Sequence, residues 1–212
     1  MLADYSCRLT KRWTSRSPSC STGEEAISLA VILEEYCTVR RCGDYIVYAT
    51  DINSKALSRL KEGKYPYSSL RQDGKKYHGE LLERYAVEKG DYTFEIAPKL
   101  LSKIEARRIN FFSDPQSSLP QGVHILFFRN TLVYFSENKR KSLIDRLVSR
   151  IAPGGDLVLS SGEIPFVAHP QLELREFDQG HVLRKVGTDG GPDGRGVSSV
   201  HDTSKTMRSG GA

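Results

Sequence analysis

One stretch decides the fold of this chain, Ser19–Ala30, which reads SCSTGEEAISLA. A short polar turn ends in a glycine and is followed at once by two adjacent carboxylates. From Glu24 to about Thr38, apolar residues recur at i, i+3, i+4 and i+7, which predicts a helix with one buried face. The sequence therefore places a Ser-Thr-Gly turn and a pair of carboxylates at the N-terminus of a helix.

Helix capping can explain one of the two glutamates, but not both. Acidic side chains are stabilised at the positive end of a helix dipole, and a capping box would pair Thr22 with Glu25 or Ser21 with Glu24. One capping box uses only one glutamate. The other is therefore a candidate for holding a ligand.

The bulk composition is typical of a globular protein with one buried domain and some appendage. The chain has 212 residues, 38% of them hydrophobic and 27% charged. No apolar run is long enough to cross a bilayer and the N-terminus has no signal-peptide core, so we expect a cytoplasmic protein without membrane insertion. The cysteines form no CxxC pair and have no histidines at zinc-ligand spacing, so we expect free thiols and no metal site. The four cysteines are Cys7, Cys20, Cys37 and Cys42.

The net charge of +5 is unevenly placed, with basic residues gathered in the first sixteen positions and between Lys55 and Lys76. Such patches can attract an acidic protein surface or nucleic acid, but they are more often solvated faces. The chain has no aromatic–basic repeat and no base-reading module. We therefore expect no nucleic-acid partner.

Strands alternate with helices along most of the chain. The predicted helices span 24–38, 54–62 and, after Ser136 as cap, the residues up to Ile151, where Pro153-Gly154-Gly155 breaks the helix. The predicted strands span 45–50, 106–112 and 123–128, and a further one begins at Leu157. This alternation predicts an α/β fold with a doubly wound, mostly parallel sheet and helices on both faces.

Three segments depart from that alternation. Residues 1–19 are polar and end in Ser15–Ser19, which we expect to be a poor, degraded first strand because of its proline and serines. Residues 65–101 are less regular, with a helix over 80–86 and an alternating strand over 92–97, which suggests a small antiparallel insertion. Residues 187–212 are rich in glycine and poor in large apolar side chains, and we expect a disordered tail beyond a domain spanning 20–186.

Polar side chains gather where the predicted strands end. In a doubly wound sheet, ligands bind outside the carboxyl ends of the strands, near the point where strand order reverses. Asp51 ends one strand, and its two oxygens could accept both hydroxyls of a ribose, although a simple turn or helix cap explains it as well. No GxGxxG or P-loop motif and no Ser-His-Asp or Cys-His arrangement is present.

Arg129 closes an apolar strand and must face a crevice or solvent, since burying it unpaired would be costly. The alternative is a salt bridge to a neighbouring carboxylate that holds a loop. Tyr134 follows shortly after, as a core aromatic or as a phenol in the crevice, and the sequence alone favours the core.

Five ordered motifs carry a resemblance to a known family. They are CSTGEEA at 20–26, YATDI at 48–52, INFF at 109–112, FRN and YF within 128–135, and APGG at 152–155. Together they resemble the CheR-type chemotaxis-receptor methyltransferases, from residue 20 to about 186. The resemblance implies a class I fold dependent on S-adenosylmethionine (SAM), with 65–101 as a small β-subdomain.

The activity implied by the resemblance is protein-glutamate O-methyltransferase. The acceptors would be glutamate side chains on receptor signalling helices, and in some members the β-subdomain tethers a receptor's C-terminal peptide. We expect a monomer. A glutamate with a pKa of about 4.3 is already ionised at neutral pH, so this reaction needs placement and partial removal of water rather than a general base.

Family roles carry over to matching positions. Glu25 would be left as the helix cap, and the catalytic candidates are Tyr134, near the transferring methyl, and Arg129. The implied cofactor-binding residues are Glu24 for the methionine portion, Asp51 for the ribose, Ile52, Asn110 and Phe111 for the adenine, and Arg129 with Asn130 along the cleft.

Other members of this family carry an N-terminal α-helical domain that contributes cofactor and receptor contacts, and we expect this chain to be the C-terminal SAM-binding domain without it. The alternative to an active enzyme is a non-catalytic module that binds a receptor or regulator, with weak or no SAM binding. A third hypothesis is a SAM-dependent enzyme that methylates a different acceptor.

Overall fold

A computed structural model describes residues 12–41, 43–70, 84–90, 92–110, 113, 120–177 and 180–187. The tail predicted to be disordered lies almost wholly outside the described residues, as does most of the helix predicted over 80–86. Within the described ranges, no helix is long and apolar enough to span a membrane.

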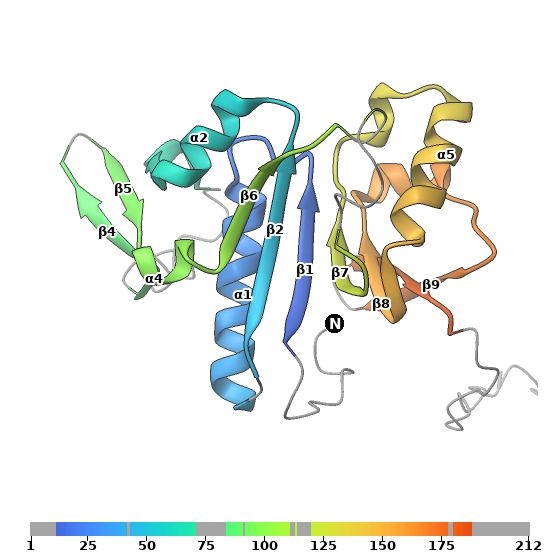
Figure 1. Cartoon of the computed structure of the whole chain (residues 1–212), viewed down its shortest axis with the longest axis horizontal. Coiled ribbons are helices and arrows are strands. Elements are labelled where there is room, and N and C mark those ends of the chain that lie inside the picture. Colours follow the sequence, from blue (N-terminus) through green and yellow to red (C-terminus); the bar gives the residue numbers. More distant parts are fainter. Residues whose placement is uncertain are drawn as a thin grey trace, which may run out of the picture.

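The centre of the molecule is a seven-stranded sheet with the order β6-β2-β1-β7-β8-β10-β9 (Figure 1). Its first five strands run parallel to their neighbours, and β10 runs antiparallel to both β8 and β9. The doubly wound, mostly parallel sheet is thus confirmed. In chain order the strands are β1 (Trp13–Pro18), β2 (Tyr45–Asp51), β6 (Ile104–Arg108), β7 (Val123–Phe127), β8 (Ile151–Val158), β9 (Leu172–Phe177) and β10 (Gly180–Lys185).

Helices cover the sheet in two separate groups. In Figure 1, α1 (Glu24–Arg40) lies to the left of β1 and partly behind β2 and β6, and α2 (Ser54–Glu62) follows β2. Their apolar side chains share one core cluster with β1 and β2, whereas α5 (Glu137–Val148) packs with β7 and β8 in a second cluster. The remaining helical pieces are η2 (Tyr67–Ser69), α4 (Pro98–Leu101), η5 (Leu132–Tyr134) and η6 (Ser161–Phe166).

The first strand overturns the expectation of a poor strand at Ser15–Ser19. β1 lies in the middle of the sheet and pairs with β2 from Trp13↔Tyr45 to Pro18↔Thr50, and with β7 on its other side. The serine hydroxyls of this strand can form hydrogen bonds with neighbouring segments. Ser15 Oγ, for example, donates to the carbonyl of Ile125 over 3.0 Å. Pro18 occupies the last position of the strand, so the backbone N–H that proline lacks is missing only at the end of the ladder.

Arg16 is a second unexpected feature of β1. Its side chain is fully buried, and one guanidinium nitrogen donates to Thr50 Oγ1 over 3.4 Å. Burial, with a smaller contribution from the nearby Arg150, lowers the pKa of Arg16 to about 9. Neighbouring strands thus supply polar partners that a pattern of apolar residues cannot reveal.

Two predicted boundaries are also wrong. The strand predicted over 106–112 is Ile104–Arg108, and the helix predicted to continue to Ile151 ends at Val148. Pro153-Gly154-Gly155 does not separate a helix from a strand, because it lies inside β8. The pairing with β7 shifts there from Val123↔Ile151 to Ile125↔Asp156, so the Pro-Gly-Gly residues form an irregularity in a continuous strand.

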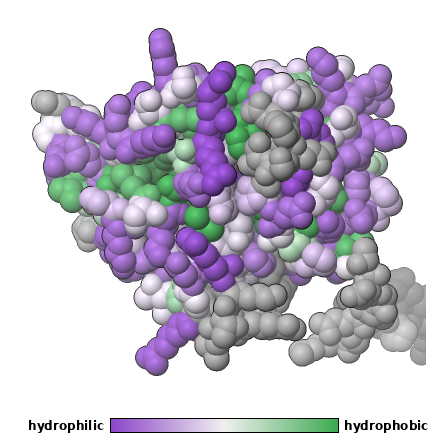
Figure 2. All heavy atoms as spheres, in the orientation of Figure 1, coloured by the Kyte–Doolittle hydropathy of each residue, from purple (hydrophilic) through white to green (hydrophobic). Residues whose placement is uncertain are grey.

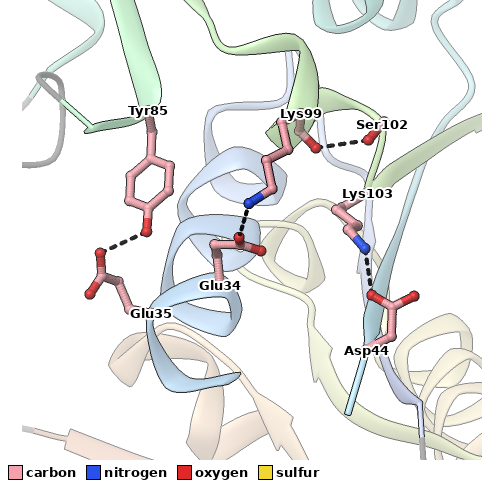
Figure 3. Close-up of polar contacts among 7 residues, drawn as sticks. All are labelled: Glu34, Glu35, Asp44, Tyr85, Lys99, Ser102 and Lys103. Atoms are coloured by element: carbon pink, nitrogen blue, oxygen red, sulfur yellow. Dashed lines mark hydrogen bonds and ion pairs between the residues drawn. The ribbon is translucent and has the colours of Figure 1, made fainter. Parts of the chain in front are cut away.

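The predicted antiparallel insertion is confirmed as a three-stranded sheet with the order β3-β5-β4 (Lys64–Pro66, Thr93–Ile96 and Ala86–Lys89). Figure 3 shows how polar contacts join this region to α1. Tyr85 Oη donates to Glu35 Oε1 over 2.7 Å, and Lys99 Nζ lies 3.2 Å from Glu34 Oε1. These contacts attach the small sheet and α4 to α1.

The face shown in Figure 2 is mostly hydrophilic, with hydrophobic atoms gathered mainly on its left side. A hollow of about 120 Å³ lies between α2, α4 and β6, lined by Leu60, Leu101 and Ile104 among others. A wider groove of about 490 Å³ separates α2 from the small sheet. Neither hollow is lined by a residue proposed above for cofactor binding or catalysis.

Candidate functional site

The sheet reverses its strand order between β1 and β7. From β1 the chain adds β2 and β6 on one side, and from β7 it adds β8 on the other. Three loops leave the carboxyl ends of the strands at this point, at 19–23, 51–53 and 128–131. In open α/β sheets, the crevice outside such a switch point is where ligands bind.

The first of these loops is a tight turn with several residues in the left-handed region. Ser19, Ser21 and Gly23 have φ values of 55°, 50° and 96°. A Cβ on Gly23 would lie 2.4 Å from Cδ1 of Leu60 on α2, so only glycine fits there. The turn is therefore specified by its glycine and by the close approach of α2.

The expected capping box is absent. The N-cap of α1 is Gly23, and no side chain bonds to the free N–H groups of the first turn. Thr22 Oγ1 instead donates to Glu24 Oε2 over 2.6 Å, and Ser17 Oγ donates to Glu25 Oε1 over 2.8 Å. The role of helix cap assigned to Glu25 is therefore wrong.

Glu25 lies at the switch point, because Ser17 of β1 donates to its carboxylate and the charge of Arg129, in the loop after β7, acts on it. Burial raises the pKa of Glu25, the Ser17 hydrogen bond and the Arg129 charge oppose that rise, and the Glu163 charge adds to it. Glu24, in contrast, acts on the phenol of Tyr65, whose hydroxyl donates to the carbonyl of Thr22. The side chain of Glu25 therefore lies near Ser17 and Arg129, whereas that of Glu24 lies near Thr22 and Tyr65.

Asp51 joins two turns at the end of β2. Its Oδ2 accepts the N–H of Ser21 and its Oδ1 accepts the N–H of Asn53, each over 2.8 Å. Asn53, not Asp51, caps α2, because its side chain accepts from the first backbone N–H groups of that helix. Each carboxylate oxygen has a further lone pair, and the neighbouring Ile52 is 62% exposed.

Asn110 comes close to this group through the backbone. The N–H of Ile109 donates to the carbonyl of Asp51 over 3.0 Å, so the chain passes the end of β2 before reaching the exposed Asn110. The structure thus brings Ser21, Asp51 and Asn110 to one end of the sheet. Phe111 lies outside the described residues.

Arg129 and Tyr134 lie in the loop after β7. Arg129 is half-buried, and no carboxylate among the described residues lies within ion-pair distance of its guanidinium, so the alternative of a loop-holding salt bridge is not supported. Its charge acts on Glu25 instead. Tyr134 is 81% exposed, so the expectation of a core aromatic is wrong.

Glu163 is a site residue that the sequence reasoning missed. It is fully buried, and its carboxylate accepts the N–H groups of Asn130, Thr131 and Leu132 over 2.7–2.8 Å. A signal was present, because Ser160 and Glu163 have the S-x-x-E spacing of a capping box, which the structure contains. That pattern indicates a helix start but not the loop that the glutamate also holds.

Comparisons with known proteins place these residues in context. Residues 4–176 match the family model described as "CheR methyltransferase, SAM binding domain". The chain is 31% identical over 69% of its length to chemotaxis protein methyltransferase 1 of Pseudomonas aeruginosa, covering 53% of that protein. It is 26% identical over 89% of its length to the chemotaxis protein methyltransferase of Escherichia coli, covering 64% of that protein.

Among solved structures, the DszA carbon methyltransferase covers 72% of this chain with a TM-score of 0.43 and 12% identity, and the match covers 29% of that chain. The chain spans about half the length of the first curated relatives it matches.

Proposed function

The chain belongs to the CheR methyltransferase family through its SAM-binding domain, and from that premise we propose that it takes part in transferring a methyl group from SAM to glutamate side chains of chemotaxis receptors. The observation that carries the proposal is the hydrogen bond from Ser17 that holds the Glu25 carboxylate at the switch point, where the Arg129 charge acts on it, with Asp51 at the end of the neighbouring β2. SAM is the cofactor of this domain, and its chemistry can be compared with these groups.

The described residues fit that cofactor. SAM has an ammonium and a carboxylate at one end, a ribose diol in the middle and an adenine at the other. The half-buried Glu25 carboxylate and the half-buried Arg129 guanidinium, whose charge acts on Glu25, match the two charges. Asp51 offers acceptors for the diol, and the exposed Ile52 offers apolar surface. We place Glu25 rather than Glu24 at the amino-acid end, with Asn110 and Asn130 along the same edge.

The residues of the chain have a limited chemical task in this reaction. When bound, the cofactor supplies a methyl group on a sulfonium that leaves as a neutral thioether. An acceptor glutamate is already ionised at neutral pH, with a pKa of about 4.3, so no residue must remove a proton. Arg129 and Tyr134 are proposed to orient the acceptor carboxylate and exclude water from it.

The acceptor proposed here is a receptor signalling helix, reached in the cytoplasm, with the small sheet as a further contact for a receptor's C-terminal peptide. The thiol of Cys20 is consistent with a reducing compartment. The curated relatives are named as chemotaxis methyltransferases, which supports the choice of acceptor.

A second candidate has one observation in its favour. Tyr134 and Ile52 are 81% and 62% exposed, so the described residues leave the outer side of the cofactor crevice open. The same exposure of Tyr134 and Ile52 is expected of a module that retains the fold and binds a receptor or regulator, with weak or no SAM affinity.

Calorimetric titration with S-adenosylhomocysteine, the demethylated product of SAM, separates the two candidates. We expect micromolar binding that is lost in Asp51→Ala. Transfer of a radiolabelled methyl group from SAM to a receptor fragment, released as methanol by mild alkali, would identify a glutamate ester. A folded chain that releases no heat on titration would favour the non-catalytic module.

A further inference from the structure

Glu163 connects two segments that are far apart in sequence. It lies in η6, directly after β8, while the loop it contacts follows β7. Oε1 accepts the N–H groups of Thr131 and Leu132, each over 2.7 Å, and Oε2 accepts the N–H of Asn130 over 2.8 Å. Three consecutive backbone donors thus converge on one side chain.

The same carboxylate is held from its own side by Ser160. The Ser160 hydroxyl donates to Oε2 over 2.5 Å and the Ser160 N–H donates to the same atom over 3.2 Å. Burial alone would raise the pKa of Glu163, but the hydrogen bonds from Ser160 and from the loop N–H groups outweigh it and lower that pKa. A buried carboxylate with this set of donors stays ionised at neutral pH, and hydrogen bonds to an ion are stronger than those to a neutral acceptor.

The loop needs such a partner because its backbone is unusual. Asn130 has φ 55°, in the left-handed region, which few residues other than glycine adopt and in which asparagine is enriched. Leu132 is fully buried and anchors the far end. Arg129 lies in the loop between β7 and Leu132. Tyr134 follows Leu132 in η5 and is exposed.

We propose that Glu163 is a positioning residue: its buried carboxylate fixes the backbone of residues 130–132, and this fixed loop sets Arg129 opposite Glu25 for cofactor binding. Glu163 does not touch the reacting groups in this proposal and acts through the loop. The inference rests on the proposed function for its cofactor readout, but its backbone readout is independent of that function.

The contact also reaches Glu25 through space. The charge of Glu163 is one of the causes that raise the pKa of Glu25, while Arg129 lowers it. If Glu163 acted on Glu25 only through its charge, removing that charge would shift the ionisation of Glu25 to lower pH. If Glu163 also holds the loop that sets Arg129, its removal weakens the larger Arg129 contribution, and the ionisation of Glu25 shifts to higher pH.

The test compares Glu163→Gln with Glu137→Gln, which removes the same charge from an exposed position at the start of α5. We expect Glu163→Gln to stay folded by circular dichroism and to bind S-adenosylhomocysteine about tenfold more weakly, since an amide presents N–H groups to donors. Amide exchange at 130–132, followed by nuclear magnetic resonance, should accelerate, and the pH at which affinity falls should shift upward, because the Arg129 contribution to the Glu25 pKa is weakened. Glu137→Gln should leave all three readouts unchanged.

A folded Glu163→Gln variant with wild-type affinity, or with unchanged protection at 130–132, would overturn the proposal. If that variant does not fold, Ser160→Ala removes one donor to the carboxylate and keeps the rest. It should bind a few-fold more weakly, with faster exchange at the same three amides, and wild-type behaviour would overturn the proposal as well. If the wild-type chain binds no S-adenosylhomocysteine, the proposed function fails for this chain, and amide exchange alone decides whether Glu163 fixes the loop.

Discussion

The hydroxyl of Ser17 on β1, an interior strand of the sheet, donates a hydrogen bond to Oε1 of Glu25 over 2.8 Å. This contact joins β1 to the first turn of α1 and turns the second glutamate of the motif toward the switch point, where Arg129 acts on it. The adjacent Glu24 accepts from Thr22 within the turn instead. Two neighbouring carboxylates therefore have different expected functions.

Exchanging each glutamate for glutamine should separate those functions. Glu25→Gln removes the charge that faces the crevice, and we expect S-adenosylhomocysteine affinity to fall about tenfold, or about 1.4 kcal/mol. Glu24→Gln should change affinity by less than about threefold. Calorimetry on the two variants checks this prediction, and the opposite order of effects would return the cofactor role to Glu24.

The same Glu25→Gln variant should be more stable than the wild type at neutral pH. Burial raises the pKa of Glu25 in the folded state above its unfolded value, so ionisation costs the folded state more than the unfolded one. That cost is fully present above the folded pKa and disappears as pH falls below the unfolded value. Thermal melts from pH 8 to pH 4 should therefore show the largest gain in Tm at the high end, at about 2–4 °C per kcal/mol.

A gain in Tm that grows on acidification would show that the sign is wrong. Glu24→Gln serves as the matched control, since it changes the same net charge one residue away.

Gly23→Ala should destabilise the chain. The new Cβ would meet Leu60 Cδ1 at 2.4 Å and would hold an L-residue at φ 96°. Overpacking and left-handed strain together cost about 2–4 kcal/mol. Urea unfolding measures the loss, and Gly162→Ala, where an added Cβ meets nothing within 4 Å, is the control. A loss below about 1 kcal/mol would mean that α2 moves aside.

The buried ion pair between β8 and β10 should matter more than an exposed one. Asp156 is fully buried, and Arg184 donates to it from Nε over 2.9 Å and from a terminal nitrogen over 3.2 Å. Arg184→Met removes that partner from a buried charge, which costs about 3 kcal/mol. Lys99→Met, at an 83% exposed lysine paired with Glu34, should cost less than about 1 kcal/mol. Equal losses in the two unfolding curves would contradict this.

Local signals were sufficient where a residue's neighbours in sequence also decide its structure. α2 spans Ser54–Glu62 as predicted, because Asn53 caps its start, Gly63 ends it in the left-handed region and Ala56, Leu57 and Leu60 are buried as expected. The alternation of strands and helices was enough to predict the parallel sheet. β1 was not predictable in this way, because Ser15 and Arg16 bond to residues more than thirty positions away.

The amino-acid sequence by itself determined the class of fold, the order of its motifs and the edge of the sheet at which the polar residues would collect. The spacing of hydrophobic residues, the helix caps and the turn residues each depend on a few neighbouring positions, so they can be identified in a single amino-acid sequence. Only the tertiary structure decided that Glu25 rather than Glu24 faces the crevice, that Tyr134 is exposed, and that Glu163 holds the loop after β7. Those outcomes depend on the rotation of α1 against β1 and on the packing of η6 against η5, which set side-chain direction across long sequence separations.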